Sequence, residues 1–158
     1  MMQVRWLVVV LCCVLLAACA SGPPRRVSEP AASIQQLTVR ADGGWTVDLR
    51  LQNYSSLPMR FDRLALAMTV NGESAGTLQA QPALTIGPES ADVLPIPLAP
   101  TPQARILLAD ALAAGRGVEY HLQGTVDAAP EDRGSARSYK IERNSRLSPV
   151  PGLPGVLR

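Results

Sequence analysis

The sequence is poor in the residues that most often carry catalysis, metal binding or base stacking. It has one histidine, His121, and only two Trp, three Tyr and one Phe among 158 residues. Of its three cysteines, Cys12 and Cys13 lie in an apolar N-terminal run, which leaves Cys19 on its own. A single cysteine forms no intrachain disulfide, and no second histidine is present to share a metal. We therefore expect no metal site, no cofactor and no stacking platform for sugars or bases.

The sequence also lacks an excess of charge of either sign. It has 15 Lys and Arg residues against 13 Asp and Glu residues. Removal of residues 1–18 would take away Arg5 alone among these, leaving 14 basic residues against the 13 acidic ones. A nearly neutral chain has no electrostatic footprint for nucleic acid, so a nucleic-acid partner is not expected.

Residues 1–18 have the three parts of an export signal. Arg5 supplies the positive region, and an uninterrupted apolar run of 11 residues follows from Trp6 to Leu16. This run is shorter than the roughly 20 residues that a membrane-spanning helix needs. The sequence therefore predicts a signal peptide over residues 1–18, with a retained transmembrane anchor as an alternative.

The end of this segment resembles the bacterial lipobox. Leu16, Ala17 and Ala18 precede Cys19, and in the lipobox such residues direct the signal peptidase while the cysteine receives diacylglycerol. The resemblance implies a lipoprotein whose lipidated Cys19 binds the membrane. Residue 20 is Ala rather than Asp, which by resemblance to enterobacterial sorting favours the periplasmic face of the outer membrane over the inner membrane. An ordinary signal peptide followed by a chance cysteine remains the alternative.

Composition divides the remaining chain into three parts. Residues 19–33 are rich in Pro, Gly and Arg and predict a flexible tether. Residues 34–144 hold the alternating patterns described next and form the predicted folded domain. Residues 145–158 include Pro149, Pro151, Gly152, Pro154 and Gly155, which predicts a disordered or extended tail.

Alternation of apolar and polar residues dominates residues 34–144 and predicts β-strands with one buried face. Asn71-Gly72 is a strong signal for a tight hairpin, because both central positions of such a turn need positive φ. Pro95 and Pro97 cannot donate to a neighbouring strand, so their strand is expected at a sheet edge. The apolar positions of the expected strands are Trp45, Val47, Leu49 and Leu51; Leu64, Leu66, Met68 and Val70; Leu94, Ile96 and Leu98; Val118, Tyr120, Leu122 and Val126; and Tyr139 and Ile141.

One helix interrupts this pattern. Thr101 is a suitable N-cap, Pro102 suits the first helical position and Gly115 suits the end. The expected architecture is an antiparallel β-sandwich with one short helix that closes an open end.

No catalytic arrangement is evident. His121 shares strand parity with Glu119 and Asp127, which predicts a solvated face for all three residues. The serines show no nucleophile-elbow pattern, and no Gly-rich phosphate loop follows a strand. The sequence therefore does not predict an enzyme.

Residues from about Ile34 to Asp127 resemble the water stress and hypersensitive response domain, a relative of the type 2 late embryogenesis abundant proteins. The landmarks are the strand that ends at Asn53, the hairpin Gly72, Gly76 in a small-residue stretch, and Gly124 in the closing segment. The chain departs from the family at Asn53-Tyr54, where Asn-Pro is common. The resemblance implies an immunoglobulin-like or fibronectin-like sandwich, a link to desiccation tolerance, structural roles for these landmarks and no catalytic residues.

The sequence thus favours a non-catalytic, stress-related envelope lipoprotein that binds or stabilises neighbouring macromolecules. An accessory subunit that docks on an outer-membrane or periplasmic assembly, through the Pro95–Pro97 edge or the Pro-rich tail, is the first alternative. A carrier that holds an apolar ligand between the sheets is the second.

Overall fold

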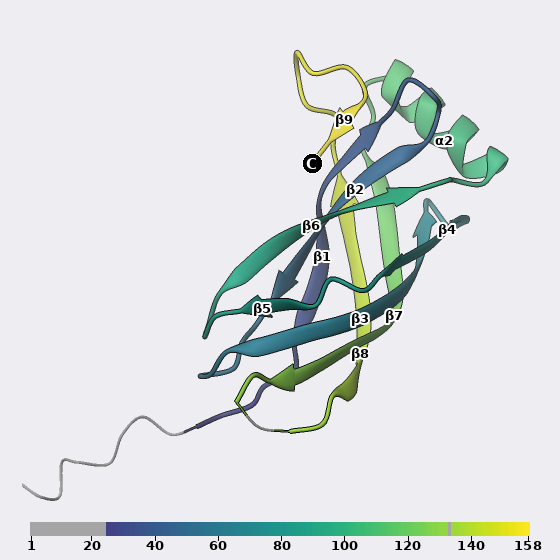
Figure 1. Ribbon diagram of the computed structural model, residues 1–158. Coiled ribbons are helices and arrows are strands. Elements are labelled where there is room, and N and C mark those ends of the chain that lie inside the picture. The colour runs from purple at the N-terminus through teal and green to yellow at the C-terminus, as the bar shows by residue number, and fades with distance from the viewer. Residues whose placement is uncertain (1–24, 133) are drawn as a thin grey trace, which may run out of the picture.

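The computed structural model describes residues 25–132 and 134–158, and these form two facing antiparallel sheets and one short helix (Figure 1). The first sheet has the strand order β6-β2-β1-β9, and the second has the order β4-β3-β7-β8 with β5 beside β3. The sandwich and the single helix confirm the coarse prediction from sequence. The elements are β1 Ala31–Val39, β2 Trp45–Gln52, β3 Met59–Val70, β4 Glu73–Ala80, β5 Leu84–Ile86, β6 Ala91–Leu98, α2 Pro102–Ala113, β7 Val118–Pro130, β8 Arg137–Leu147 and β9 Val156–Leu157.

Side chains of both sheets meet in one buried cluster. The alternating positions of β2, β3 and β7 face this cluster as predicted, and Trp45, Leu49, Leu66 and Leu122 are completely buried. Burial of large apolar side chains is the main stabilising contribution to a fold of this size. In β8, Ile141 is buried whereas Tyr139 is only partly buried, because β8 lies at the edge of its sheet.

Irregularities in the register bend three strands and shift their inward positions. β1 has one between Ile34 and Gln36, and β3 has one between Phe61 and Arg63. A third lies where β4 pairs with β3, between Met68 and Thr69. A β-bulge adds one residue to one strand, so the parity of the inward-facing positions changes across it.

The predicted turn and edge are both present. Asn71 and Gly72 join β3 to β4 with φ of 47° and 85°, the positive values that a tight hairpin needs. β6 carries Pro95 and Pro97 and lies at the edge of the first sheet, as expected.

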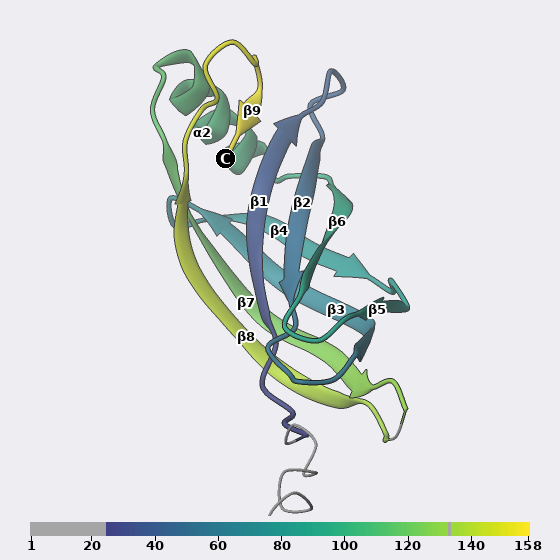
Figure 2. The same ribbon diagram turned by 90° about the vertical axis from the view of Figure 1, so that its left-hand side faces the viewer.

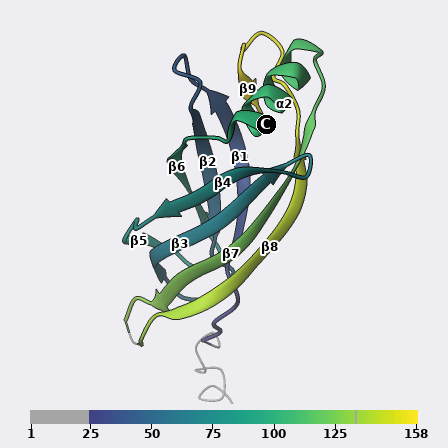
Figure 3. The same cartoon turned by 90° about the vertical axis from the view of Figure 1, so that its right-hand side faces the viewer.

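The helix begins and ends where the sequence predicts. The Thr101 hydroxyl accepts a hydrogen bond from the Ala104 amide at 3.3 Å, and Pro102 is the first helical residue. Ala104, Leu108 and Ala111 are buried against the sandwich, whereas Ile106 is 71% exposed. α2 contacts β4 and β3 at the end of the molecule where β9 also lies (Figures 1 and 3).

The prediction of a disordered tail over residues 145–158 is wrong. Residues 145–147 complete β8, and Leu37 and Thr38 of β1 pair with Leu157 and Val156 of β9 (Figure 2). Gly152 and Gly155, with φ of 79° and 75°, form the turn that brings the chain back. The glycines and prolines of this segment therefore shape a turn, and burial of Leu157 holds it on the sandwich.

Within residues 25–132 and 134–158, no helix has the length and hydrophobicity to cross a membrane.

Candidate functional site

The predicted lipidation site lies outside the described residues. Cys19 and the recognition residues Leu16, Ala17 and Ala18 all precede residue 25, where the described part of the chain begins. The signal peptide, the lipid anchor and the first part of the tether remain predictions.

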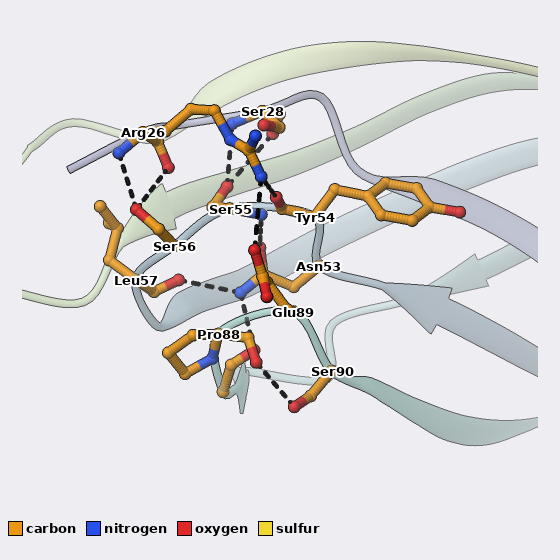
Figure 4. A network of polar contacts seen from close by, with 11 residues as sticks. Arg26, Ser28, Asn53, Tyr54, Ser55, Ser56, Leu57, Pro88, Glu89 and Ser90 are labelled. Atoms are coloured by element: carbon orange, nitrogen blue, oxygen red, sulfur yellow. Dashed lines mark hydrogen bonds and ion pairs between the residues drawn. The ribbon is translucent and has the colours of Figure 1, made fainter. Parts of the chain in front are cut away.

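Asn53 joins three segments at the end of β2 (Figure 4). Its side chain is only 1% exposed, and its amide nitrogen donates to the carbonyl oxygens of Leu57 at 2.9 Å, Ile86 at 3.1 Å and Gly87 at 2.8 Å. Its oxygen accepts a hydrogen bond from the Ser55 amide at 2.8 Å. An amide group has two N–H bonds, so the three carbonyls share two hydrogen atoms. Asn53 thereby fixes the loop before β3 against the end of β5.

The same loop holds the N-terminal segment of the described chain (Figure 4). The Ser28 amide donates to the Ser55 hydroxyl at 3.0 Å, and the Arg26 amide donates to the Ser56 hydroxyl at 2.8 Å. The Ser56 amide in turn donates to the Arg26 carbonyl at 2.9 Å. We call residues 26–28 together with residues 54–56 the N-terminal clamp.

The clamp corrects the predicted boundary of the tether. Residues 19–33 were expected to be flexible, but residues 26–28 are hydrogen-bonded to the domain and β1 begins at Ala31. Pro30 is also buried. The folded domain therefore begins before the expected residue 34. A signal for this contact exists in the Asn53-Tyr54-Ser55-Ser56 segment, because Asn and Ser side chains often bond to nearby backbone in loops. Sequence reasoning identified Asn53 but not its neighbours.

The three landmark glycines occupy positions where a side chain would be costly. Gly72 has positive φ in the hairpin, and Gly76 has a φ of 132° with Leu98 close to the place of a Cβ atom. A Cβ atom on Gly124 would lie 2.0 Å from the carbonyl oxygen of Ala65 on the neighbouring strand. These glycines allow local turns and a close approach of backbones.

His121 lies on the outer face of the second sheet, on the side that its parity predicts. Its Nδ1 atom is 2.6 Å from Oδ1 of Asn144 on β8. Around it, a shallow hollow of about 500 Å³ opens to solvent. The other lining residues are Thr69, Gly72, Glu119, Tyr120, Ser145 and Arg146.

Two serine hydroxyls and one carboxylate make contacts of a structural kind. The Ser55 hydroxyl bonds to backbone atoms of Ser28, and the Ser90 hydroxyl donates to the Pro88 carbonyl at 2.8 Å. Hydrogen bonding to Arg60, whose Nε is 2.7 Å away, lowers the pKa of Asp62 below that of an ordinary aspartate. Within residues 25–132 and 134–158, no group of three or more His, Cys, Asp and Glu side chains could hold a metal ion.

Comparison with known structures finds similar chains of low identity. A protein from Archaeoglobus fulgidus, known from a crystal structure, is 14% identical, with a TM-score of 0.43 over 79% of this chain and 98% of that chain. A solution structure from Arabidopsis thaliana is 13% identical, with a TM-score of 0.48 over 80% of this chain and 83% of that one. An X-ray structure of a structural-genomics target is 15% identical, with a TM-score of 0.49 over 81% and 92%.

The comparison with curated proteins gives no match. A family model described as late embryogenesis abundant protein matches residues 48–138, which is more than half of the 158-residue chain. The match runs from β2 into β8 and includes Asn53, the hairpin and the close approach at Gly124. The chain therefore belongs to the type 2 late embryogenesis abundant family.

Proposed function

We propose that the chain is a non-catalytic lipoprotein of the bacterial cell envelope, in which lipidated Cys19 holds a stress-protective β-sandwich at the membrane. The family match over residues 48–138 carries this proposal, because membership of this family points to a water-stress-type role. We place the sandwich in the immunoglobulin-like or fibronectin-like class, and within the family it resembles the water stress and hypersensitive response domain.

Membrane attachment rests on the leader and on the beginning of the domain. The leader ends in Leu16-Ala17-Ala18-Cys19, and the N-terminal clamp ties the chain to the sandwich from Arg26 onward. A mature lipoprotein cysteine with several acyl chains anchors firmly, since each buried methylene contributes about 0.8 kcal/mol. Ala20 favours the periplasmic face of the outer membrane as the location.

Binding or stabilisation of neighbouring macromolecules is the activity that we propose for the domain. Ser55 and Ser90 contact backbone, and His121 contacts an asparagine, so the described polar groups support a structural role. One continuous buried cluster between the sheets favours a packed core over an apolar-ligand carrier. Docking as an accessory subunit of an envelope assembly is compatible with this role.

The test compares three versions of the full chain in a strain that lacks the gene. Wild-type protein and His121→Ala should restore survival after drying, whereas Cys19→Ala should not, because the protein leaves its membrane. His121→Ala should change the free energy of unfolding by no more than about 0.5 kcal/mol, as is usual for surface substitutions.

Mass spectrometry of the mature wild-type protein should show a lipidated Cys19 at the N-terminus. Any other mature N-terminus would overturn the anchor, and loss of survival with His121→Ala in a folded protein would overturn the non-catalytic role.

A further inference from the structure

Among the described residues, the edge strands of the two sheets differ in whether they could pair with an added strand. β5 has three residues and β9 has two, so both are too short to pair with a long strand. The part of β1 that does not pair with β9 contains a bulge, and its Ile34 amide donates to the Tyr120 hydroxyl at 3.1 Å. At the start of β4, the Thr101 hydroxyl donates to the Ser74 carbonyl at 2.6 Å. The Thr101 amide also donates to the Ala75 carbonyl at 3.3 Å, so the first part of β4 is covered. β8, with 11 residues, is the longest of the edge strands, and β4 and β6 have eight each.

The β6 edge is blocked by proline. The backbone amide of Asn53 donates to the Ser90 carbonyl. Hydrogen bonding alternates along an antiparallel pair, so the odd-numbered residues of β2 direct their backbone N–H and C=O groups toward β6. Their partners on β6 are Asp92, Leu94, Ile96 and Leu98, which leaves the backbone of Pro95 and Pro97 facing outward. Proline has no N–H, so this edge offers few donors to an added strand.

The β8 edge has no such block. The backbone amide of Asn71 donates to the Glu119 carbonyl. The backbone groups of the odd-numbered residues of β7 therefore bond to β3, and those of the even-numbered residues bond to β8. The even residues pair with the odd residues of β8, without interruption from Val118–Leu147 to Ala128–Arg137. The backbone groups that face outward therefore belong to Ser138, Lys140, Glu142, Asn144 and Arg146, and all of these residues are exposed. None of them is proline.

Charge identifies the kind of strand that fits. β8 carries four basic residues, Arg137, Lys140, Arg143 and Arg146, and one acidic residue, Glu142. It thus holds four of the 15 basic residues of the chain and only one of the 13 acidic ones. All four basic side chains are exposed, and no ion pair involves any of them within the part of the chain that the structure describes. A second copy would bring the same basic strand alongside, and like charges on adjacent strands repel.

Two further features lie on the same strand. Asn144 and Arg146 line the hollow around His121 on the outer face, which leaves room for a side chain beside the edge. On the inner face, the Tyr139 hydroxyl is buried and has no hydrogen-bond partner among the described residues. The edge therefore offers a polar recess as well as outward backbone groups.

We propose that β8 is a docking edge that adds an acidic, extended segment of a partner protein to the second sheet. Outward N–H and C=O groups of β8 pair with the backbone of the segment, and its Asp or Glu side chains meet Arg137, Lys140, Arg143 and Arg146. This inference holds whether or not Cys19 is lipidated. It assigns docking to β8 rather than to the Pro95–Pro97 edge.

The test uses the full chain in detergent and a fluorescent peptide of about ten residues, the length of a typical long strand, in which Glu alternates with Val and Thr. A second peptide has Lys in place of every Glu. The acidic peptide should bind, its affinity should fall as salt is added, and the basic peptide should not bind. Lys140→Glu with Arg143→Glu should weaken binding of the acidic peptide at least about tenfold.

A matched pair of variants tests the backbone contribution. Glu142→Gln and Glu142→Pro both remove the carboxylate, but only proline removes the outward N–H. Glu142→Gln should bind the acidic peptide at least as well as wild type, whereas Glu142→Pro should bind at least about tenfold more weakly. Val93→Pro, at an outward position of the β6 edge where the amide already donates to the Asp92 carboxylate at 2.7 Å, should leave binding unchanged.

Hydrogen exchange on the wild-type protein keeps the test decisive if Glu142→Pro does not fold. The peptide should slow exchange of the amides of Lys140, Glu142 and Asn144, while Tyr139 and Ile141, already bonded to β7, should change little. Equal binding by Glu142→Pro and Glu142→Gln, equal binding of both peptides, or protection on β6 instead would each overturn the proposal. So would dimerisation through β8, which would make a second copy the occupant.

Discussion

At the end of β2, the side chain of Asn53 connects two loops through hydrogen bonds. Asn53 donates to three carbonyl groups and accepts from one amide, and it is buried at the junction of two loops. A buried carbonyl group without a donor destabilises the fold, because the free-energy cost of its transfer out of water is no longer offset by a hydrogen bond. Asn53 is therefore the structural centre of the loops that carry the N-terminal clamp.

Replacement of Asn53 by Asp tests this role with almost no change in shape. The carboxylate cannot donate to Leu57, Ile86 or Gly87, and it places acceptor oxygens against their carbonyl oxygens. We expect a loss of at least about 2 kcal/mol in the free energy of unfolding at neutral pH, measured by urea denaturation. Part of that loss should return in acid, where the carboxyl group is protonated and can donate. A variant as stable as wild type at neutral pH would mean that Asn53 does not hold this junction.

Gly124 illustrates a different requirement, the close approach of two strands. We expect Gly124→Ala to destabilise the protein by about 2 kcal/mol or more, because the added methyl group would overlap the Ala65 carbonyl and force the backbone to move. Gly87→Ala is the control, since the nearest atom to its Cβ position is the Ser90 hydroxyl at 3.7 Å. Thermal unfolding of both variants should separate them, and equal melting temperatures would show that β3 and β7 adapt at no cost.

At the scale of elements, the strands that sequence predicts well are those with unbroken alternation. Trp45 to Leu51 in β2 and Val118 to Val126 in β7 keep one parity, so their inward faces follow directly from the sequence. In β1 the buried residues change from Ile34 to Leu37 across a bulge, and in β3 they change from Phe61 to Leu64. A change of parity breaks the period of two, so the first parts of these strands could not be found from it.

The C-terminal element was missed for another reason. β9 has two residues, and its formation depends on a tertiary contact with β1 rather than on local propensity. Composition alone cannot distinguish glycines and prolines that shape a turn from those of a disordered segment. Likewise, the N-terminal clamp depends on hydrogen bonds between residues far apart in the sequence, such as Ser28 and Ser55.

Two leucines of the C-terminal segment give a test of its order. Leu157 is completely buried and Leu153 is 49% exposed. Leu157→Ala should lower the free energy of unfolding by about 2–5 kcal/mol, as for other leucines removed from a core. Leu153→Ala should change it by less than about 0.5 kcal/mol. A disordered segment would make both substitutions neutral in the same denaturation experiment.

At the scale of the whole molecule, the two ends of the sandwich differ in character. The N-terminal clamp and the loop between β7 and β8 lie at one end, whereas α2 and β9 lie at the other (Figures 1 and 2). An ion pair between Arg25 and Asp132 also joins the N-terminal segment to the first of these ends. The seven residues from Cys19 to Arg25 can span at most about 25 Å, because an extended chain advances by 3.3–3.6 Å per residue. If Cys19 carries the lipid, the clamp end therefore stays close to the membrane.

This geometry predicts the orientation of the domain on a vesicle. The 12 residues of β3 correspond to about 40 Å of strand, so the end with α2 can lie much farther from the lipid. Energy transfer from a fluorophore on Glu131→Cys, at the clamp end, to an acceptor in the bilayer should be more efficient than transfer from Leu153→Cys, at the opposite end. Insertion of a flexible Gly-Ser segment between residues 24 and 25 should reduce this difference, because a longer tether permits more orientations. Equal transfer from both positions in lipidated chains without the insertion would mean that the clamp does not orient the domain, and that the N-terminal segment detaches from Ser55 and Ser56 at the membrane.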